Sequence, residues 1–170
     1  MSLPILVQYN IPRYVIGKPG KQNHACTGEM TIMPGLAVPF EFIYSNNDGV
    51  PINLTDFTLR LVFWFPQQNY ELLPANLNTN VVLVKDLIIE DPYTGTAGVL
   101  LDDQETLTIG AGGRGSLRWS IYMIDTLSGN TFGTQITAIG GLYGICHIER
   151  TDMPNAETIK GSTVSPTVPA

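Results

Sequence analysis

Apolar and polar residues alternate with a period of two in the middle of the chain. The clearest stretch is FTLRLVFWF at residues 57–65, where every odd position is Phe or Leu and the even positions are Thr58, Arg60, Val62 and Trp64. Successive side chains of a β-strand point to opposite faces, whereas a helix would mix these two sets. The pattern predicts a strand with a buried Phe and Leu face, from which Val62 and Trp64 point away.

A second alternating stretch, LRWSIYMID at residues 117–125, divides in the same way. We expect Trp119 to point into the core, and Arg118 and Tyr122 to point away from it. Residues 102–107 form the best helical candidate, of one or two turns. Shorter apolar runs that predict further strands occupy residues 38–44, 81–90, 97–101, 131–138 and 142–148.

Turn residues separate the predicted strands. The sequences NDG at 47–49, DPYTG at 91–95 and SGN at 128–130 combine residues that tolerate tight-turn backbone angles. Short strands joined by such turns are typical of an antiparallel β-sandwich. The chain is therefore expected to be all-β.

The two ends of the chain lack this periodicity. Prolines and glycines interrupt the first part, and Pro, Thr and Ser dominate the last residues. We expect an extended N-terminal arm at residues 1–37, a sandwich domain at 38–151, and an extended or disordered tail at 152–170. Arms of this kind often add strands to the sheet edge of a neighbouring subunit.

Composition restricts the class of protein. A chain of 170 residues that is 44% hydrophobic has room for one domain with a substantial core. Its net charge of -6 and nine scattered Lys and Arg argue against nucleic acid as a partner. No apolar run approaches the ~20 residues of a membrane-spanning helix, and we recognise no signal peptide at the first residues. Cys26 and Cys146 are expected to be reduced thiols.

The spacing of Gly110, Gly112 and Gly115 matches G-x-G-x-x-G, the glycine pattern of a dinucleotide-binding loop. That loop needs a strand before it and a helix after it, because the helix N-terminus holds the pyrophosphate. Here a predicted strand follows the glycines. We interpret the segment as a bend between elements and expect no cofactor.

Few residues suggest catalysis or metal binding. His24 lies in the irregular N-terminal part, and His147 and its neighbour Cys146 point to opposite faces of a predicted strand. Carboxylates at Asp102, Asp103 and Glu105, and the oxygen-rich segment at residues 46–48, fit calcium or acid–base chemistry only in residue type, because no EF-hand spacing is present. A glycosidase pair from distant strands stays open, yet we expect no enzyme and no metal site.

The outward-pointing side chains are better candidates for a function. Trp64, Arg118 and Tyr122 are predicted to lie on an outer sheet face, where aromatic rings suit a protein interface or a platform for sugar stacking. The alternative is that the N-terminal segment covers this face.

Three segments resemble a known family. PFEFIYSNNDGVPINLTDFTLRLVF, DPYTGTAGVLLDDQETLTI and LRWSIYMIDTLSGN are similar, in their strands and turns, to the immunoglobulin-like N-terminal domain of bacteriophage baseplate upper proteins and related tail accessory proteins. The resemblance covers residues 38–148. Its motifs consist of turn and core residues, which specify a fold more firmly than a role.

The resemblance implies an immunoglobulin-like β-sandwich in a virion structural protein. Such a subunit of a tail, baseplate or neck would be made in the host cytoplasm, would bind other virion proteins, and would form a homo-oligomeric ring or symmetric array without catalytic residues. The competing hypothesis is a carbohydrate-binding module for host surface polysaccharide, with sugar rings stacked on Trp64 and Tyr122.

Overall fold

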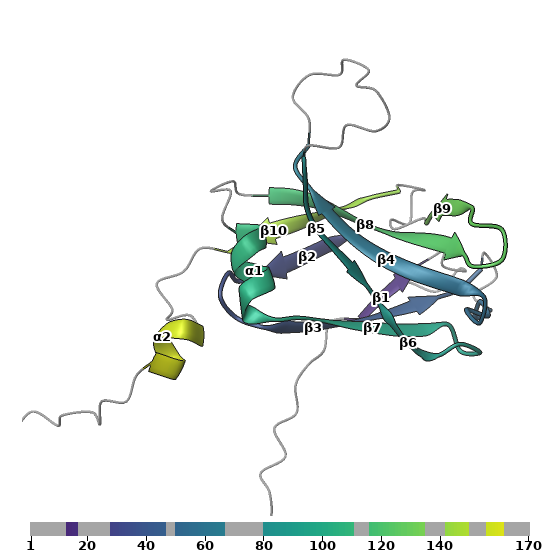
Figure 1. Ribbon diagram of the computed structural model, residues 1–170, viewed down its shortest axis with the longest axis horizontal. Coiled ribbons are helices and arrows are strands. Elements are labelled where there is room, and N and C mark those ends of the chain that lie inside the picture. The colour runs from purple at the N-terminus through teal and green to yellow at the C-terminus, as the bar shows by residue number, and fades with distance from the viewer. Residues whose placement is uncertain are drawn as a thin grey trace, which may run out of the picture.

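The computed structural model describes residues 13–16, 28–46, 50–66, 80–110, 116–134, 142–149 and 156–161. Two β-sheets face each other across a shared core, as Figure 1 shows. Sheet A contains, in spatial order, β1 (Arg13–Ile16), β3 (Val38–Tyr44), β7 (Thr96–Leu101) and β6 (Ile88–Asp91). Sheet B contains β2 (Glu29–Ile32), β10 (Gly144–Ile148), β8 (Ser116–Asp125), β4 (Phe57–Trp64) and β5 (Val81–Asp86), and β9 (Thr131–Gly133) pairs with β8. The helices are α1 (Asp103–Gly110) and α2 (Ala156–Gly161).

The core forms where the two alternating strands face sheet A. Leu59, Leu61 and Phe63 of β4 are fully buried, as the two-residue period predicts. Trp119 of β8 is also fully buried, and its ring centroid lies 5.9 Å from that of Phe42 on β3. This aromatic contact joins the two sheets. The predicted all-β sandwich is confirmed.

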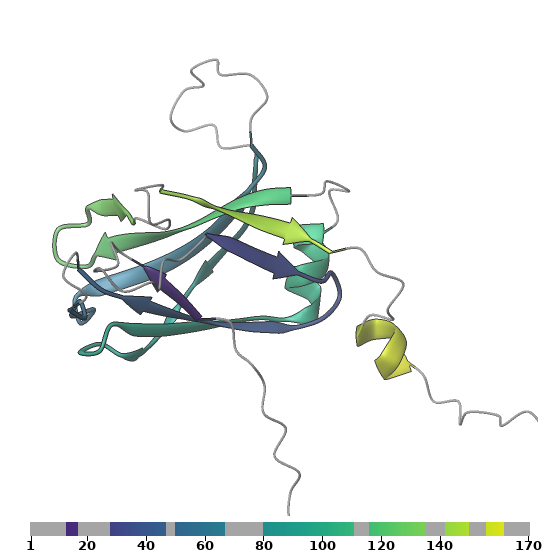
Figure 2. The same cartoon turned by 180° about the vertical axis from the view of Figure 1, so that it is seen from behind.

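The predicted domain boundary at residue 38 is too late. Strand β2 pairs in parallel with β10, and the two strands lie side by side in Figure 2. Met30 and Ile32 point into the core, where Met30 is 2% exposed. Strand β1 also falls within the segment expected to be an arm, and it pairs in parallel with β3 at the edge of sheet A. Strands of four residues are too short to establish a period among prolines and glycines.

The tail also departs from the expectation of an extended or disordered segment. Helix α2 occupies part of it, in the sequence AETIKG, which contains the good helix formers Ala, Glu and Lys. Lys160 forms an ion pair with Asp103 at the start of α1. Neither of the helices in the described ranges is long and apolar enough to cross a membrane.

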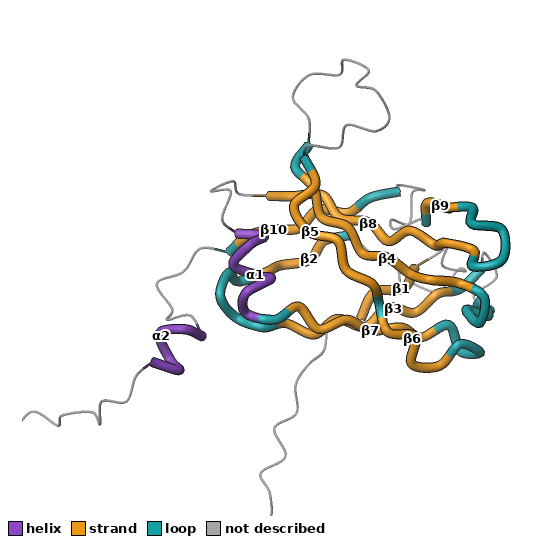
Figure 3. Tube along the Cα trace, viewed as in Figure 1, coloured by secondary structure: helices purple, strands orange, loops and turns teal. Residues whose placement is uncertain are grey.

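Helix α1 confirms the short helix predicted near residues 102–107. Figure 3 shows it at one end of the sandwich, where the chain passes from sheet A to sheet B. Asp102 caps the helix, since its Oδ1 accepts a hydrogen bond from the Glu105 backbone N–H at 2.8 Å. Glu105 Oε1 in turn accepts from the Asp102 backbone N–H at 3.3 Å, which completes a capping box.

The glycine-rich segment follows α1 and precedes β8. The helix ends at Gly110 and the strand begins at Ser116, so the order is the reverse of the strand–loop–helix order that a dinucleotide loop requires. Gly112 and Gly115 lie outside the described residues.

Two of the predicted turns are present in the structure. Gly95 has a φ of 67° and Gly129 a φ of 75°, angles that favour glycine. The Asp125 N–H donates to the Asn130 carbonyl at 2.9 Å, which closes the turn between β8 and β9. The strand predicted at 131–138 is described only as β9, and the turn at 47–49 lies outside the described residues.

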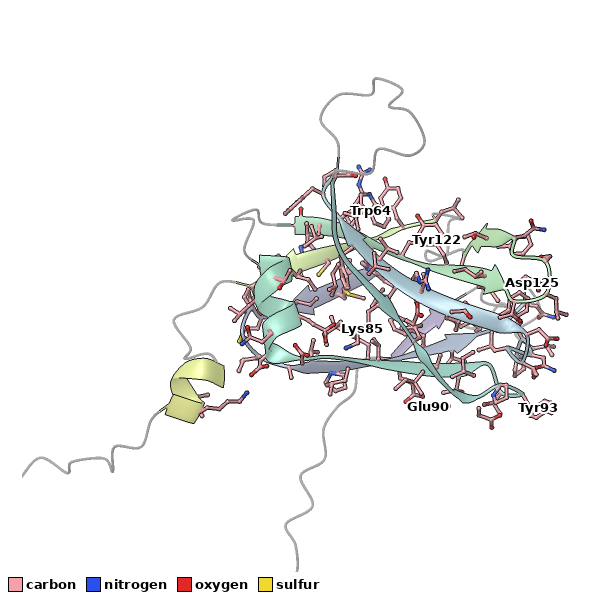
Figure 4. All side chains as sticks on the ribbon, viewed as in Figure 1. Trp64, Lys85, Glu90, Tyr93, Tyr122 and Asp125 are labelled. Atoms are coloured by element: carbon pink, nitrogen blue, oxygen red, sulfur yellow. The ribbon has the colours of Figure 1, made fainter. Side chains whose placement is uncertain are left out.

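The run predicted as one strand at 81–90 serves both sheets. It forms β5 in sheet B, crosses the core at the buried Leu87, and continues as β6 in sheet A. Lys85 points between the sheets, as Figure 4 shows, where its Nζ donates to the Leu100 carbonyl at 2.6 Å and to Glu105 Oε1 at 2.5 Å. An inward charge on an edge strand discourages unwanted pairing with other chains.

Candidate protein-binding face

The outer face of sheet B is organised in rows that run across its strands. One row contains Ile145 of β10, Arg118 of β8, Trp64 of β4 and Val81 of β5, each in register with the next. Because the neighbouring positions on each strand fill the core, these four side chains point outward. The register therefore places the predicted candidates Trp64 and Arg118 directly opposite each other.

Tyr143 joins these two candidates into a cluster. The Trp64 and Tyr143 rings meet edge to face, with centroids 6.3 Å apart and an interplanar angle of 71°. The Arg118 Cζ lies 4.5 Å from the centre of the Tyr143 ring, within the range of a cation–π interaction. Such a contact contributes about 0.5–1 kcal/mol at an exposed site. The interaction holds a long cationic side chain in one orientation at the surface.

Apolar side chains surround this cluster and are open to solvent. Tyr143 is 43% exposed, Ile145 42% and Val84 50%. Val62 lies in register with both Ser120 and Val84, so the second row continues the apolar surface. Contiguous exposed apolar groups mark interaction sites more often than isolated ones do. We call this surface the aromatic face, formed by Val62, Trp64, Val84, Arg118, Tyr143 and Ile145.

Tyr122, the third predicted candidate, lies on the same sheet face but outside the cluster. It is in register with Arg60, two rows away from Arg118 along β8. Arg60 is held by Asp86, with its Nε donating at 2.6 Å to Oδ1 and its Nη2 at 3.3 Å to Oδ2. The hydrogen bond from Arg60 lowers the pKa of Asp86. This row therefore contains a satisfied ion pair and a half-buried tyrosine.

The sequence also contained a signal for Tyr143, which falls in the strand predicted at residues 142–148 but was not among the candidate residues. In LYGICHI, the residues Gly144, Cys146 and Ile148 are buried, whereas Ile145 and His147 are exposed. Tyr143 extends the exposed set by one step of two. The alternation alone would have placed it outward, but its contact with Trp64 depends on the order of strands in the sheet.

His147 and Cys146 point to opposite faces of β10, as the alternation predicts. His147 Nε2 lies 3.8 Å from a Glu29 carboxylate oxygen on the outer face. Cys146 points into the core, where burial raises the pKa of its thiol to about 12. A thiol with so high a pKa is a poor nucleophile at neutral pH. His24 and Cys26 lie outside the described residues.

The carboxylates before and within α1 form hydrogen bonds with the helix backbone and an ion pair with Lys160. Asp102 and Glu105 form the capping box, and the Glu105 backbone N–H lowers the pKa of Asp102. Asp103 pairs with Lys160, which lowers the pKa of that carboxyl. No group of three or more His, Cys, Asp or Glu side chains suited to a metal ion occurs among the described residues. Of the segment at 46–48, Asn46 Oδ1 accepts from the Val50 N–H at 3.0 Å, and the rest lies outside the described ranges.

Comparison with known proteins gives no relative by sequence, since no family model and no curated protein matches the chain. Among solved structures, the chain is similar to the N-terminal domain of phage TP901-1 ORF48, with a TM-score of 0.47 and 11% identity over 82% of this chain and 100% of that chain. It is also similar to reduced auracyanin from Roseiflexus castenholzii, with a TM-score of 0.37 and 12% identity over 81% of this chain and 97% of that one. A third similar structure is auracyanin A, a blue copper protein from Chloroflexus aurantiacus, with a TM-score of 0.34 and 14% identity over 81% and 98% of the two chains.

Proposed function

We propose that this chain is a structural subunit of a bacteriophage particle, an accessory or adaptor protein of the tail, baseplate or neck. It assembles by protein contacts, forms a homo-oligomer, and has no catalytic role. The phage assignment is supported by the sequence resemblance over residues 38–148. The aromatic face supports the part of the proposal that concerns protein contacts.

The observation that carries the contact function is the chemistry of the aromatic face. Trp64 and Tyr143 present large rings on rigid strands, and Arg118 is the charged group of their cluster. Trp, Tyr and Arg are the residues most enriched at the energetic centres of protein interfaces, which are poor in Lys and Glu. Side chains held by a sheet lose little further entropy when a partner binds.

The same geometry makes the carbohydrate-binding alternative less suitable. A sugar stacks on an open ring face, and here the Arg118 guanidinium lies over the Tyr143 ring. Tyr122, the second platform of that hypothesis, is four residues from Arg118, about 13 Å at roughly 3.3 Å per residue along a strand. A glycan that stacks on both Trp64 and Tyr122 would have to bridge two separate rows.

The composition of purified particles tests the function. We expect mass spectrometry of gradient-purified phage to identify tryptic peptides of this chain at a fixed copy ratio to the major tail proteins. A non-structural protein from the same infected cells serves as the control for carry-over. Detection in infected cells but not in intact particles would contradict the virion assignment, and binding of the isolated protein to host polysaccharide in place of virion proteins would favour the alternative.

A further inference from the structure

The outer face of sheet A contains a hollow on the side of the sandwich opposite the aromatic face. Its volume is about 240 Å³. Gly98 forms its floor, because this residue is in register with both Glu41 and Ile88 and has no side chain to fill the space between them. We call it the Gly98 hollow, lined by Pro39, Glu41, Ile88, Glu90, Gly98 and Leu100.

The rim of the Gly98 hollow is apolar and exposed. Ile88 is 72% exposed and Leu100 56% exposed, although both belong to strands of the sandwich. Removing such side chains from water on binding contributes about 25 cal/mol per Å² of apolar area. The hollow therefore offers a partner both a recess and an apolar border.

A carboxylate lies over the floor of this hollow. The register of β6 shifts between Ile89 and Asp91, so Glu90 occupies a β-bulge. A Cβ atom built on Gly98 would lie 2.5 Å from Glu90 Oε1, which shows that the carboxylate occupies the space of the missing side chain. Within the described ranges, no Lys, Arg or His side chain forms an ion pair with Glu90.

The two opposite faces complement each other in charge and shape. Figure 4 shows Trp64 and Glu90 pointing away from the sandwich on opposite sides. The aromatic face projects Arg118 and two rings, and among the described residues no carboxylate pairs with Arg118. A guanidinium prefers a carboxylate partner and carries an apolar stem. The Gly98 hollow supplies a carboxylate for the guanidinium and an apolar rim for the stem.

We propose that the aromatic face of one copy of this chain docks on the Gly98 hollow of a second copy, with Arg118 paired to Glu90. This inference rests on the proposed function and names the partner of its binding face. The contact is head to tail, because it joins two different surfaces, and it extends to a ring or a longer stack according to the rotation between copies. Two aromatic faces meeting each other would bring their arginines together, and the carboxylate in the same row, Glu29 of β2, lies two strands from Arg118 beside His147, which disfavours a symmetric dimer.

Two single variants each remove one half of the proposed contact. Arg118→Glu reverses the charge on the aromatic face. Gly98→Val fills the hollow and displaces the flexible end of Glu90, while the nearest backbone atom, the Phe40 carbonyl oxygen, stays 3.5 Å from the new Cβ. The φ of Gly98 is not among the positive ones, so valine fits the strand. Thr31→Glu on β2, at the edge of the same outer face as Arg118, is the matched control.

Sedimentation velocity over a concentration series measures the self-association of each protein. We expect the wild-type chain and Thr31→Glu to associate with increasing concentration, and each test variant alone to bind itself at least about tenfold more weakly, as when an interfacial charge pair is lost. A mixture of Arg118→Glu and Gly98→Val should form a 1:1 dimer that does not grow, because only one intact pair of faces remains.

Several outcomes would overturn the inference. These are a wild-type chain that stays monomeric, a test variant that still associates as the wild type does, or a mixture of the two that gives no dimer. Circular dichroism confirms that each variant is folded, and Glu90→Gln repeats the test without a change in side-chain volume. Since particle composition is measured separately, a monomeric chain found in virions would refute this contact and the homo-oligomer, and would leave the virion assignment standing.

Discussion

Trp119 connects parts of the chain that are far apart in sequence. Its Nε1 donates a hydrogen bond to the Gly28 carbonyl at 2.9 Å, inside the core. Gly144 passes so close that a Cβ atom there would lie 2.5 Å from the same nitrogen and 2.1 Å from the Gly28 oxygen. Glycine at residue 144 is therefore a packing requirement. The two-residue period predicts that Trp119 is buried, but it does not predict which backbone lies against its ring.

Tyr44 is a buried side chain whose hydroxyl is poorly satisfied. Burial raises the pKa of its phenol well above the usual range, and the nearby Thr134 hydroxyl opposes this shift only in part. Thr134 Oγ1 donates its hydrogen bond to the Ile121 carbonyl at 2.6 Å. No hydrogen-bond partner for the Tyr44 hydroxyl occurs in the described part of the chain.

Tyr44→Phe should therefore stabilise the protein. We expect the free energy of unfolding to rise by about 1 kcal/mol, because a desolvated hydroxyl without a partner is removed. Denaturant titration followed by fluorescence measures the change. Thr134→Val is the control and should lower stability by about 1 kcal/mol, since it deletes a hydrogen bond that is made. A loss of stability in Tyr44→Phe would show that the hydroxyl has a partner.

At the level of elements, β2 is a strand that the local sequence alone does not predict. Its four residues alternate between solvent and core, and parallel pairing with β10 places them at the edge of sheet B. The parallel pairing cannot arise from a local hairpin, because a parallel neighbour requires a long connection. Only the packing of distant segments places this strand in the sandwich.

Substitutions within β2 test whether residues 29–32 belong to the core. Met30→Ala should lower the free energy of unfolding by about 2–4 kcal/mol, because it leaves a cavity at a buried position. Thr31→Ala, on the exposed face of the same strand, should change it by less than about 0.5 kcal/mol. Equal effects of the two substitutions on the free energy of unfolding in urea would show that residues 29–32 do not belong to the core.

For the molecule as a whole, several surface carboxylates depend on the folded state for their low pKa. In Asp125, the backbone N–H of Leu127 lowers the pKa, with a donor–acceptor distance of 2.9 Å. In Asp86, Arg60 has the corresponding effect. The folded-state pKa lies below the unfolded value of about 3.9, so the ionised form favours folding. The resulting stability is present above that value and is lost as the pH falls through the folded-state pKa.

Stability should accordingly decrease as the pH is lowered from 5 to 2. We expect Asp125→Ala to be less stable than the wild type at pH 7, because the turn loses its charged acceptor. The difference should shrink as the pH falls, since the wild-type carboxyl is then protonated. Thermal unfolding of both proteins across this pH series measures the effect. If the difference in stability stays constant down to pH 2, it arises from the lost contacts of the side chain and not from its charge.

The sequence by itself determined the all-β class, the buried faces of β4 and β8, the turns at Gly95 and Gly129, and the short helix α1. These features arise from the period of two, positive-φ glycines and local capping, each of which acts within about ten residues. The same period placed Val62, Trp64, Arg118 and Tyr122 outward, so three members of the aromatic face were predictable.

The tertiary structure alone decided how these pieces combine. In it, β2 pairs with sheet B, and the run at 81–90 is divided between the two sheets at Leu87. Tyr143 contacts Trp64 and Arg118. The tertiary structure also created the Gly98 hollow from three strands. The physical reason is that strand order and register are set by contacts between residues far apart in sequence, whereas periodicity shows only which side of a strand is buried.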